Sequence, residues 1–481
     1  MENEQPNNSD TTQMGDNNTF RDSLATIDDS GKRKWVYPEK PKGKFHNYRA
    51  VVAVMLLLFL YIAPFLKMNG QPIIMMNFLN REFYIFGFTF WPQDFHIFVF
   101  AMIVGIVFII LFTVVYGRIF CGWLCPQTIF LEMIYRKIEY LIEGNATHQK
   151  RLNKKPFDLD KLFRKALKHS IFFVIAFATG NIFLSYVIGM DSLFQIISSP
   201  PTEHLTGLIG MLAFSGAFYF VFSNFREQAC TLVCPYGRFQ GVLLDANSIV
   251  ISYDQKRGEP RGKLNKGLVS AGNGDCINCG KCHRVCPTGI DIRNGTQLEC
   301  INCTACIDAC NEIMDKVKLP RGLIRYASSN NIEKGGGKVL SARAIGYSIV
   351  LCLLVSIVVF LFITRQDIEA TVLRAPGVLY QTVDENRISN LYNMKAVNKT
   401  DREIPFNVRM EGISGEIILS DNSGILAPQS IYETTLFVVV KNSDLKKIST
   451  KFDLIFSNNG EILTTAKTAF LGPLQTKFGD E

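Results

Sequence analysis

Five long apolar stretches constrain the fold of this chain more than any other feature. A helix crosses a bilayer with roughly 20 consecutive apolar residues, and lipid accepts only elements whose backbone hydrogen bonds are satisfied internally. We therefore predict an α-helical transmembrane bundle with spans at Tyr48–Leu66, Phe95–Tyr116, Ser170–Gly189, Leu205–Phe225 and Ala342–Thr364.

These spans set the domain boundaries. Residues 1–45 are polar and lack apolar periodicity, so we expect a disordered tail that is not a signal peptide. Residues 46–250 hold four spans, and residues 336–365 hold the fifth. The apolar stretch 73–90 also contains Asn, Arg, Glu and several aromatic residues, which favours a segment at the membrane interface over a sixth span.

Basic residues predict the orientation of the chain in the membrane. Lys and Arg are concentrated in the segments 32–49, 118–168 and 226–343. The positive-inside rule places these segments in the cytoplasm and the C-terminal domain in the periplasm. This topology accounts for the formal net charge of +8, so we expect no nucleic-acid partner. Charged side chains are almost absent from the middle of the spans, which counts against an ion transporter.

The segment 366–481 has the pattern of a small all-β domain. Turns rich in Asn, Asp, Gly and Ser separate β-rich runs. These runs are Phe406–Met410, Gly415–Leu419, Tyr432–Lys441, Lys451–Phe456 and Glu461–Ala466. We predict an immunoglobulin-like β-sandwich. The segment contains neither cysteine nor histidine, so we expect it to serve in docking rather than in redox chemistry.

Cysteine spacing is the strongest functional signal in the chain. Eight of the thirteen cysteines form two runs of the pattern Cys-x2-Cys-x2-Cys-x3-Cys within residues 251–335. This is the bacterial ferredoxin spacing, in which the fourth cysteine of each run binds the other cluster. The spacing predicts two [4Fe–4S] clusters, one bound by Cys276, Cys279, Cys282 and Cys310 and the other by Cys300, Cys303, Cys306 and Cys286.

Zinc is the alternative metal for these runs, because Cys-x2-Cys pairs also build zinc sites. Two complete runs favour iron–sulfur, since three closely spaced thiolates wrap one side of a cubane and a distant fourth closes it. Pro287 follows the last cysteine of the first run, whereas Asn311 takes that place in the second. This difference leaves all eight ligands in place.

Two further cysteine pairs have the pattern Cys-x3-Cys-Pro. Cys121 and Cys125 follow the second span, and Cys230 and Cys234 follow the fourth. Residues four apart on a helix share a face, so each pair could clamp a metal or form a reversible disulfide. Soft thiolates select Cu(I), zinc or iron–sulfur. A single pair would suit small buried residues at a helix end, but two copies at matching places favour a shared function. The remaining cysteine, Cys352, is expected to pack inside its span.

Together these features resemble the cytochrome c oxidase accessory proteins of the FixG, RdxA and CcoG type. Five spans, the paired Cys-x3-Cys-Pro motifs, the two-cluster ferredoxin-like insert and the β-domain carry the resemblance. It covers nearly the whole chain beyond the polar tail. The resemblance implies a multi-pass protein of the bacterial inner membrane that takes part in assembling cbb-type cytochrome c oxidase.

The resemblance also implies an activity and roles for the cysteines. The family is viewed as a cupric reductase, so we expect an oxidoreductase that converts Cu(II) to Cu(I). Copper would be its substrate or a bound ion, held at the catalytic residues Cys121, Cys125, Cys230 and Cys234. The ferredoxin cysteines would supply electrons. The implied partners are the oxidase subunits or copper chaperones, together with a cytoplasmic electron donor that the sequence does not identify.

Two other functions remain open at this point. The chain could be a quinol-linked electron-transfer subunit that feeds a periplasmic respiratory reductase, because similar membrane ferredoxins also carry Cys-x3-Cys-Pro motifs. It could also be a structural assembly scaffold with vestigial clusters, although the intact ligand sets argue against this.

Overall fold

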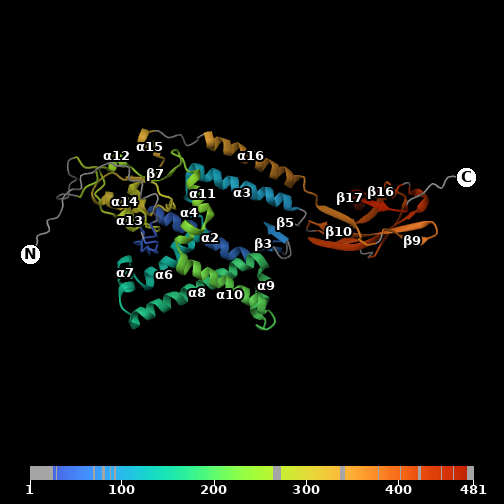
Figure 1. Ribbon diagram of the computed structural model, residues 1–481, viewed down its shortest axis with the longest axis horizontal. Helices are drawn as coiled ribbons and strands as arrows, with labels where there is room; N and C mark the ends of the chain where they lie inside the picture. The colour runs from blue at the N-terminus through green and yellow to red at the C-terminus, as the bar shows by residue number, and fades with distance from the viewer. Residues whose placement is uncertain are drawn as a thin grey trace, which may run out of the picture. The chain divides into compact units, whose positions relative to one another are not determined.

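The computed structural model describes residues 25–473 except 29, 69–70, 78–81, 87, 91–93, 264–271, 336–341, 378, 401, 421–423, 446 and 459 (Figure 1). The chain divides into two compact units. The membrane–ferredoxin unit comprises Met1–Lys67, Pro72–Arg81 and Phe98–Val355, and the β unit comprises Met68–Gln71, Glu82–Ile97 and Ser356–Glu481.

Five helices within the described ranges are long and apolar enough to cross a membrane. They are α2 (Lys44–Ile62) with its extension η1 (Ala63–Phe65), α3 (Phe95–Tyr116), α8 (Leu159–Ile188), α10 (Leu205–Phe220) with its extension η4 (Val221–Phe225), and α16 (Ala342–Ile363). The predicted spans are therefore present. α8 begins at Leu159, well before Ser170, because Asp158 caps it by accepting a hydrogen bond from the Leu159 backbone N–H.

Short elements connect these helices. The short helices are α4 (Ile119–Trp123), α5 (Pro126–Ile129), η3 (Phe130–Tyr135), α6 (Arg136–Ile142), α7 (Ala146–Lys154), α9 (Met190–Ser198), η5 (Ala229–Val233), α11 (Pro235–Leu243), α12 (Gln255–Gly258), α13 (Lys281–Arg284), η6 (Ile292–Asn294), α14 (Ala305–Lys316) and α15 (Ser329–Lys334). The first strands are β1 (Lys67–Met68), β2 (Gln71–Pro72) and β3 (Ile74–Asn77).

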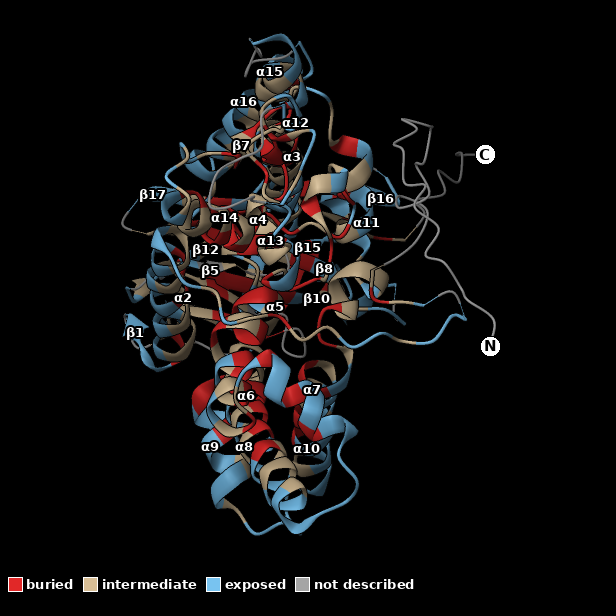
Figure 2. Cartoon of the chain, turned by 90° about the vertical axis from the view of Figure 1, so that its left-hand side faces the viewer, coloured by how far each residue is buried: buried red, intermediate tan, exposed pale blue. Residues whose placement is uncertain are grey.

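The long helices keep large apolar side chains on their outer faces. Examples on three different helices are Phe59, Phe108 and Phe360, all of which are exposed. Figure 2 shows buried positions where α6 and α8 pack and exposed ones on their outer sides. This distribution suits helices whose outer faces contact lipid. Cys352, predicted to pack inside its span, is instead exposed on α16.

A network of buried ion pairs joins the short helices after α3 to α8 and to the segment before η5. Its bonds are Arg136–Glu132 (2.6 Å), Arg136–Glu227 (3.3 Å), Lys168–Glu143 (2.9 Å) and Arg226–Glu139. Arg136 also donates from Nη2 to the Pro287 carbonyl at 3.0 Å. Removing one partner of such a pair costs about 3–5 kcal/mol, so the network fixes the ferredoxin-like segment against the helices.

One strand pair closes the ferredoxin-like segment. β6 (Val250–Tyr253) pairs antiparallel with β7 (Ile324–Ala327), in the register Val250↔Ala327. Both cysteine runs lie between these strands, on the loops around α13 and α14. The pairing therefore brings the two runs back toward each other, as a two-cluster ferredoxin requires.

The β unit contains the predicted sandwich. In the described part of this unit, one sheet has the order β13-β15-β10-β8 with β9 beside β10, and another has the order β12-β16-β17. The strands are β8 (Ile368–Arg374), β9 (Gln381–Asp384), β10 (Arg387–Asn398), β11 (Ile404–Pro405), β12 (Asn407–Glu411), β13 (Gly415–Leu419), β14 (Ile425–Leu426), β15 (Ser430–Lys441), β16 (Ser449–Asn458) and β17 (Glu461–Leu471). Tyr392, Leu436, Leu454 and Phe470 belong to the core between them.

Two expectations need correction. Residues 25–43 belong to the tail predicted as disordered, but Arg33 lies 3.9 Å over the Trp35 ring and pairs with Glu227 at 3.0 Å; residues 1–24 lie outside the described ranges. The prediction also missed β8, whose burial does not alternate, and β10, whose burial alternates only in its middle. In the described part of the stretch 73–90, β3, β4 (Glu82–Ile85) and β5 (Phe88–Phe90) are short strands and no helix spans a membrane, which agrees with the expectation that this stretch is not a sixth span.

Candidate metal centres

The first predicted ligand set lines one cavity. Cys276, Cys279, Cys282 and Cys310 surround it, together with apolar side chains such as Ile313 and Leu323. We call this the cluster 1 site. Cys310 comes from α14 and the other three cysteines come from the first run, so the cavity is closed by both runs. Cys279 is exposed, whereas Cys276 and Cys282 are buried.

The second predicted ligand set lines a separate cavity. Cys286, Cys300, Cys303 and Cys306 surround it, with Ile290 among the apolar side chains. We call this the cluster 2 site. Cys282 lines this cavity as well as the first, so the two sites are adjacent. This arrangement provides a short path for electrons between two clusters.

The two runs share an unusual backbone turn. Each contains the tetrapeptide Cys-Ile-Asn-Cys, and Asn278 and Asn302 both have a φ of 52°. Gly280 and Thr304 follow each turn at φ values of 65° and 66°. A β-branched residue such as Thr304 rarely adopts this conformation, and such strain concentrates at functional sites. The repeated turn is a signal that the sequence contained and that the cysteine spacing alone did not use.

Buried donors support the fit of a sulfide-rich group at the cluster 2 site. Arg49 Nη2, Arg118 Nε and Asn302 Nδ2 are buried and have no hydrogen-bond partner among the described protein atoms. The thiols of Cys300 and Cys303 interact electrostatically with Arg118 and Arg49 respectively. Buried donors normally have acceptors. The sulfur atoms of a [4Fe–4S] cluster would supply them here, and the cluster would supply one-electron transfer when bound.

The two Cys-x3-Cys-Pro motifs have matching local structure. Cys121 lies on α4 and Cys230 on η5, one turn before Cys125 and Cys234. Cys125 and Cys234 are the N-cap residues of α5 and α11, and the following proline begins each helix. Proline suits the first helical position because it needs no hydrogen-bond acceptor there. The two motifs therefore resemble each other in local structure as well as in sequence.

The two motifs contact each other. Gln240 on α11 is fully buried, and its Nε2 donates to Cys121 Sγ at 3.1 Å. Gln127 on α5 donates in return to the Arg226 carbonyl at 3.3 Å, just before the second motif. Each motif is thus held by a side chain that follows the other motif.

The four thiols of the motifs lie close enough to affect one another. Burial, together with charge repulsion from Cys125, Cys121 and Cys234, raises the pKa of Cys230 to about 12. Burial likewise raises the pKa of Cys121 to about 11, although the Gln240 amide opposes this. Cys121 and Cys230 are therefore protonated at neutral pH without a metal, and metal binding at these two thiols would release protons.

No three His, Cys, Asp or Glu side chains in the described ranges are arranged to hold a single metal ion. For the ferredoxin cysteines this is expected, because a cubane spreads its ligands over four iron atoms. For the four motif cysteines it means that the described geometry is not a closed single-ion site.

The first motif packs directly on the cluster 2 site. Cys121 packs against a buried cluster of Val285, Ile301, Cys303, Ala305 and Ala309. A Cβ added at Gly122 would overlap the Ile301 carbonyl oxygen and would lie 2.9 Å from the Asn302 carbonyl carbon. Only glycine allows this approach, which brings Cys121 beside the second run.

Known families match three parts of the chain. Residues 225–329 match a 4Fe-4S dicluster domain, residues 98–147 match a 4Fe-4S binding domain, and residues 358–473 match the immunoglobulin-like fold at the C-terminus of FixG. Protein RdxB of Cereibacter sphaeroides is 35% identical over 76% of this chain and 80% of RdxB. Protein RdxA of the same organism is 31% identical over 79% of this chain and 83% of RdxA. The chain belongs to the FixG/RdxA/RdxB family.

Membership in this family makes the chain an iron–sulfur electron-transfer protein with two [4Fe–4S] clusters, as predicted. The nitrogen fixation protein FixG of Rhizobium meliloti is 36% identical over 62% of this chain, and the match spans only 58% of FixG. A crystal structure of a FixG-related protein from Vibrio parahaemolyticus aligns with 23% of this chain and all of that chain, at 17% identity and a TM-score of 0.20. That likeness carries no structural inference.

Several residues of this FixG-family site were not predicted. Arg49, Gln240 and Asn302 lie far apart in sequence from the cysteines of the first motif, yet they contact that motif or face cluster 2. Arg118 was visible as a residue before the first motif, but its contacts were not. The repeated Cys-Ile-Asn-Cys tetrapeptide was the available signal for Asn302; nothing in the sequence indicated Arg49 or Gln240.

Paired cysteine replacements test which run completes each cluster. Wild-type protein should contain about eight iron atoms per chain. C276A/C310A removes two ligands of the cluster 1 site, so about four iron atoms should remain. C276A/C286A removes one ligand from each site and should lose nearly all iron. Equal iron loss in both double variants, measured by metal analysis of purified protein, would contradict the shared ligation.

A second prediction concerns the approach of the first motif to the cluster 2 site. G122A should force the backbone at Ile301 away, at a cost of about 1–3 kcal/mol. Electron transfer from cluster 2 to an acceptor at Cys121 should then slow, because the substitution moves Cys121 away from the second cysteine run and electron transfer slows as donor and acceptor separate. Stopped-flow reoxidation of the reduced clusters measures this rate. G105A, whose added Cβ meets nothing within 4 Å on α3, is the control.

Proposed function

We propose that this chain is a membrane-bound cupric reductase that supplies Cu(I) for the assembly of cbb-type cytochrome c oxidase. The observation that carries the proposal is the packing of Cys121 against Cys303 and its neighbours at the cluster 2 site. This packing would place a one-electron donor, cluster 2, beside the four thiols of the two motifs. The reduction of Cu(II) to Cu(I) consumes one electron, which matches the single electron that a [4Fe–4S] cluster passes.

The chemistry of the four motif cysteines supports copper as the substrate. Soft thiolates prefer Cu(I) to harder ions, so they favour the product of the reduction. Cu(II) bound near Cys121 would accept one electron from the cluster side, and the resulting Cu(I) would stay on the thiolates until a partner removes it. We propose copper chaperones or oxidase subunits as the partners that remove this Cu(I).

The four motif cysteines provide the direct test of this function. Replacing Cys121, Cys125, Cys230 and Cys234 together with serine should abolish Cu(II) reduction and leave the iron content unchanged. A colorimetric Cu(I) chelator measures the product. C352S, which alters the remaining cysteine on α16, should keep full activity and controls for general thiol loss.

Two outcomes would sink the copper proposal. One is undiminished Cu(II) reduction by the variant that lacks all four motif cysteines. The other is absence of copper reduction by wild-type protein that reoxidises its clusters with a quinone, because this would favour the quinol-linked electron-transfer alternative. Both assays should therefore be run on the same preparation.

We further propose that the N-terminus and both clusters face the cytoplasm and the β unit faces the periplasm of the inner membrane. The distribution of Lys and Arg supports this orientation. All cysteines of the cluster sites and motifs would then lie on the reducing side, where thiols persist.

Reporter fusions test this orientation. Alkaline phosphatase, which folds only where disulfides form, should be active when fused after Pro473 and inactive when fused after Lys155, in the loop predicted to be cytoplasmic. The reverse pattern of activity would overturn the orientation. Immunoblots of both fusions control for expression.

A further inference from the structure

Arg118 occupies a buried position between both Cys-x3-Cys-Pro motifs and the second cysteine run. It lies between α3 and α4, only 5% of it is exposed, and its side chain reaches away from both helices. Nη1 donates to the Leu298 carbonyl, two residues before Cys300, and Nη2 donates to the Gly237 carbonyl at 3.0 Å, after the second motif. One guanidinium therefore links three segments that are far apart in sequence.

The same guanidinium interacts electrostatically with Cys121 of the first motif and Cys300 of the second run. Burial lowers the pKa of Arg118, whereas its interactions with Cys121, Cys300 and Glu299 raise it. Its Nε is buried and has no hydrogen-bond partner among the described atoms. Glu299 is the nearby carboxylate, and its Oε1 accepts from the Ala25 backbone N–H. Its hydrogen bonds to Leu298 and Gly237 are to neutral carbonyl oxygens, which leave its positive charge uncompensated by these two bonds.

A buried positive charge beside a cluster has a definite electrostatic effect. Reduction makes the cluster more negative, so a nearby cation stabilises the reduced state and raises the reduction potential. The effect is large in a site shielded from water, because the effective dielectric is low. The cluster 1 site differs, since Arg293, the arginine that faces Cys282 and Cys276, is paired with Asp291.

We propose that Arg118 is a positioning residue that raises the potential of cluster 2 and holds Cys121 beside it, so that electrons leave the ferredoxin-like segment through cluster 2. The second half of this proposal rests on the proposed function, because it names Cys121 as the acceptor side. Electrons enter at cluster 1, whose ligand Cys279 is exposed.

The proposed electron transfer to copper is balanced by one external electron donor. Each Cu(II) takes up one electron and becomes Cu(I), and the electron comes from a reduced cluster 2. One electron then moves from cluster 1 to cluster 2. A low-potential one-electron carrier, of the reduced iron–sulfur or flavin protein class, replaces it at cluster 1. No bond between heavy atoms forms or breaks in these steps.

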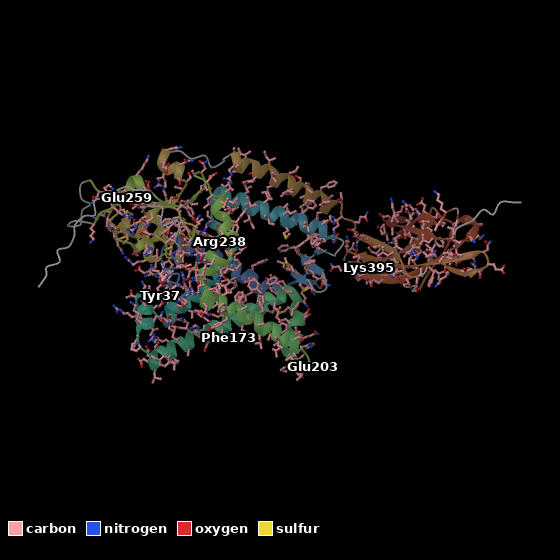
Figure 3. All side chains as sticks on the ribbon, in the orientation of Figure 1. Tyr37, Phe173, Glu203, Arg238, Glu259 and Lys395 are labelled. Atoms are coloured by element: carbon pink, nitrogen blue, oxygen red, sulfur yellow. The ribbon has the colours of Figure 1, made fainter. Side chains whose placement is uncertain are left out.

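The chain offers a matched control for Arg118. Gly237-Arg238 follows the second motif and has the same Gly-Arg sequence as Gly117-Arg118, which precedes the first. Arg238 is exposed on α11, where it is labelled in Figure 3. Removing this second charge tests whether any loss of positive charge near the motifs has the same effect.

The test is a redox titration of each cluster, monitored by electron paramagnetic resonance, with copper reduction measured alongside. R118Q should lower the equilibrium constant for reducing cluster 2 at least tenfold, or about 59 mV for one electron, and leave cluster 1 unchanged. R118K keeps the charge and should restore most of the potential. R238Q should match wild type. C276A/C310A, which keeps only cluster 2, assigns the signal.

An unchanged cluster 2 potential in R118Q, or an equal fall in R118Q and R118K, would overturn the role of the charge. Should R118Q lose iron, an R49K variant grown with arginine carrying a heavy nitrogen isotope decides the question, because Arg49 also lies near this site. Pulsed resonance of cluster 2 should detect arginine nitrogen, and its absence would refute the contact. A lowered potential in R118Q beside a wild type inactive on copper would instead reject the proposed function and keep the role of Arg118 at cluster 2.

Discussion

The close backbone approach between Gly122 and the Ile301–Asn302 turn is the contact on which the rest of the functional unit depends. It lets Cys121 pack on the shell of cluster 2. The turn itself is in a left-handed conformation at Asn302, which brings its carbonyl groups against α4. A larger residue than glycine at position 122 would separate the two sets of cysteines. The absence of a side chain at Gly122 thus allows the motif cysteines and the cluster sites to form one unit.

Hydrogen bonds made by charged side chains hold the same contact region together. Asp308, between two cluster ligands on α14, accepts from the backbone N–H groups of Phe45 and His46 and so caps the first membrane helix. Arg49, one turn further along α2, donates to the Gly122 carbonyl. Arg136 reaches Pro287 from the buried ion-pair network. Each of these groups is buried or half-buried, so leaving its partner unsatisfied would be costly.

The β unit has a different basis for its stability. Its sheets enclose an apolar core, and Tyr392, Leu436 and Leu454 are inaccessible to water. Its segment 366–481 contains neither cysteine nor histidine. The redox sites and the β-sandwich thus lie in separate parts of the chain. This division agrees with the match of residues 358–473 to the domain at the C-terminus of FixG.

The sequence by itself determined the five membrane helices and the β-sandwich, and it predicted the division of the cluster cysteines into two sets. These follow from local periodicity and from fixed ligand spacing, which act over a few residues. Tertiary structure alone decided that Cys121 lies against cluster 2, that Gln240 bonds to it and that Arg118 joins three segments. Those contacts link positions more than one hundred residues apart, where no short pattern reports proximity. The Cys-x3-Cys-Pro pairs were visible from the start, but only packing showed what they face.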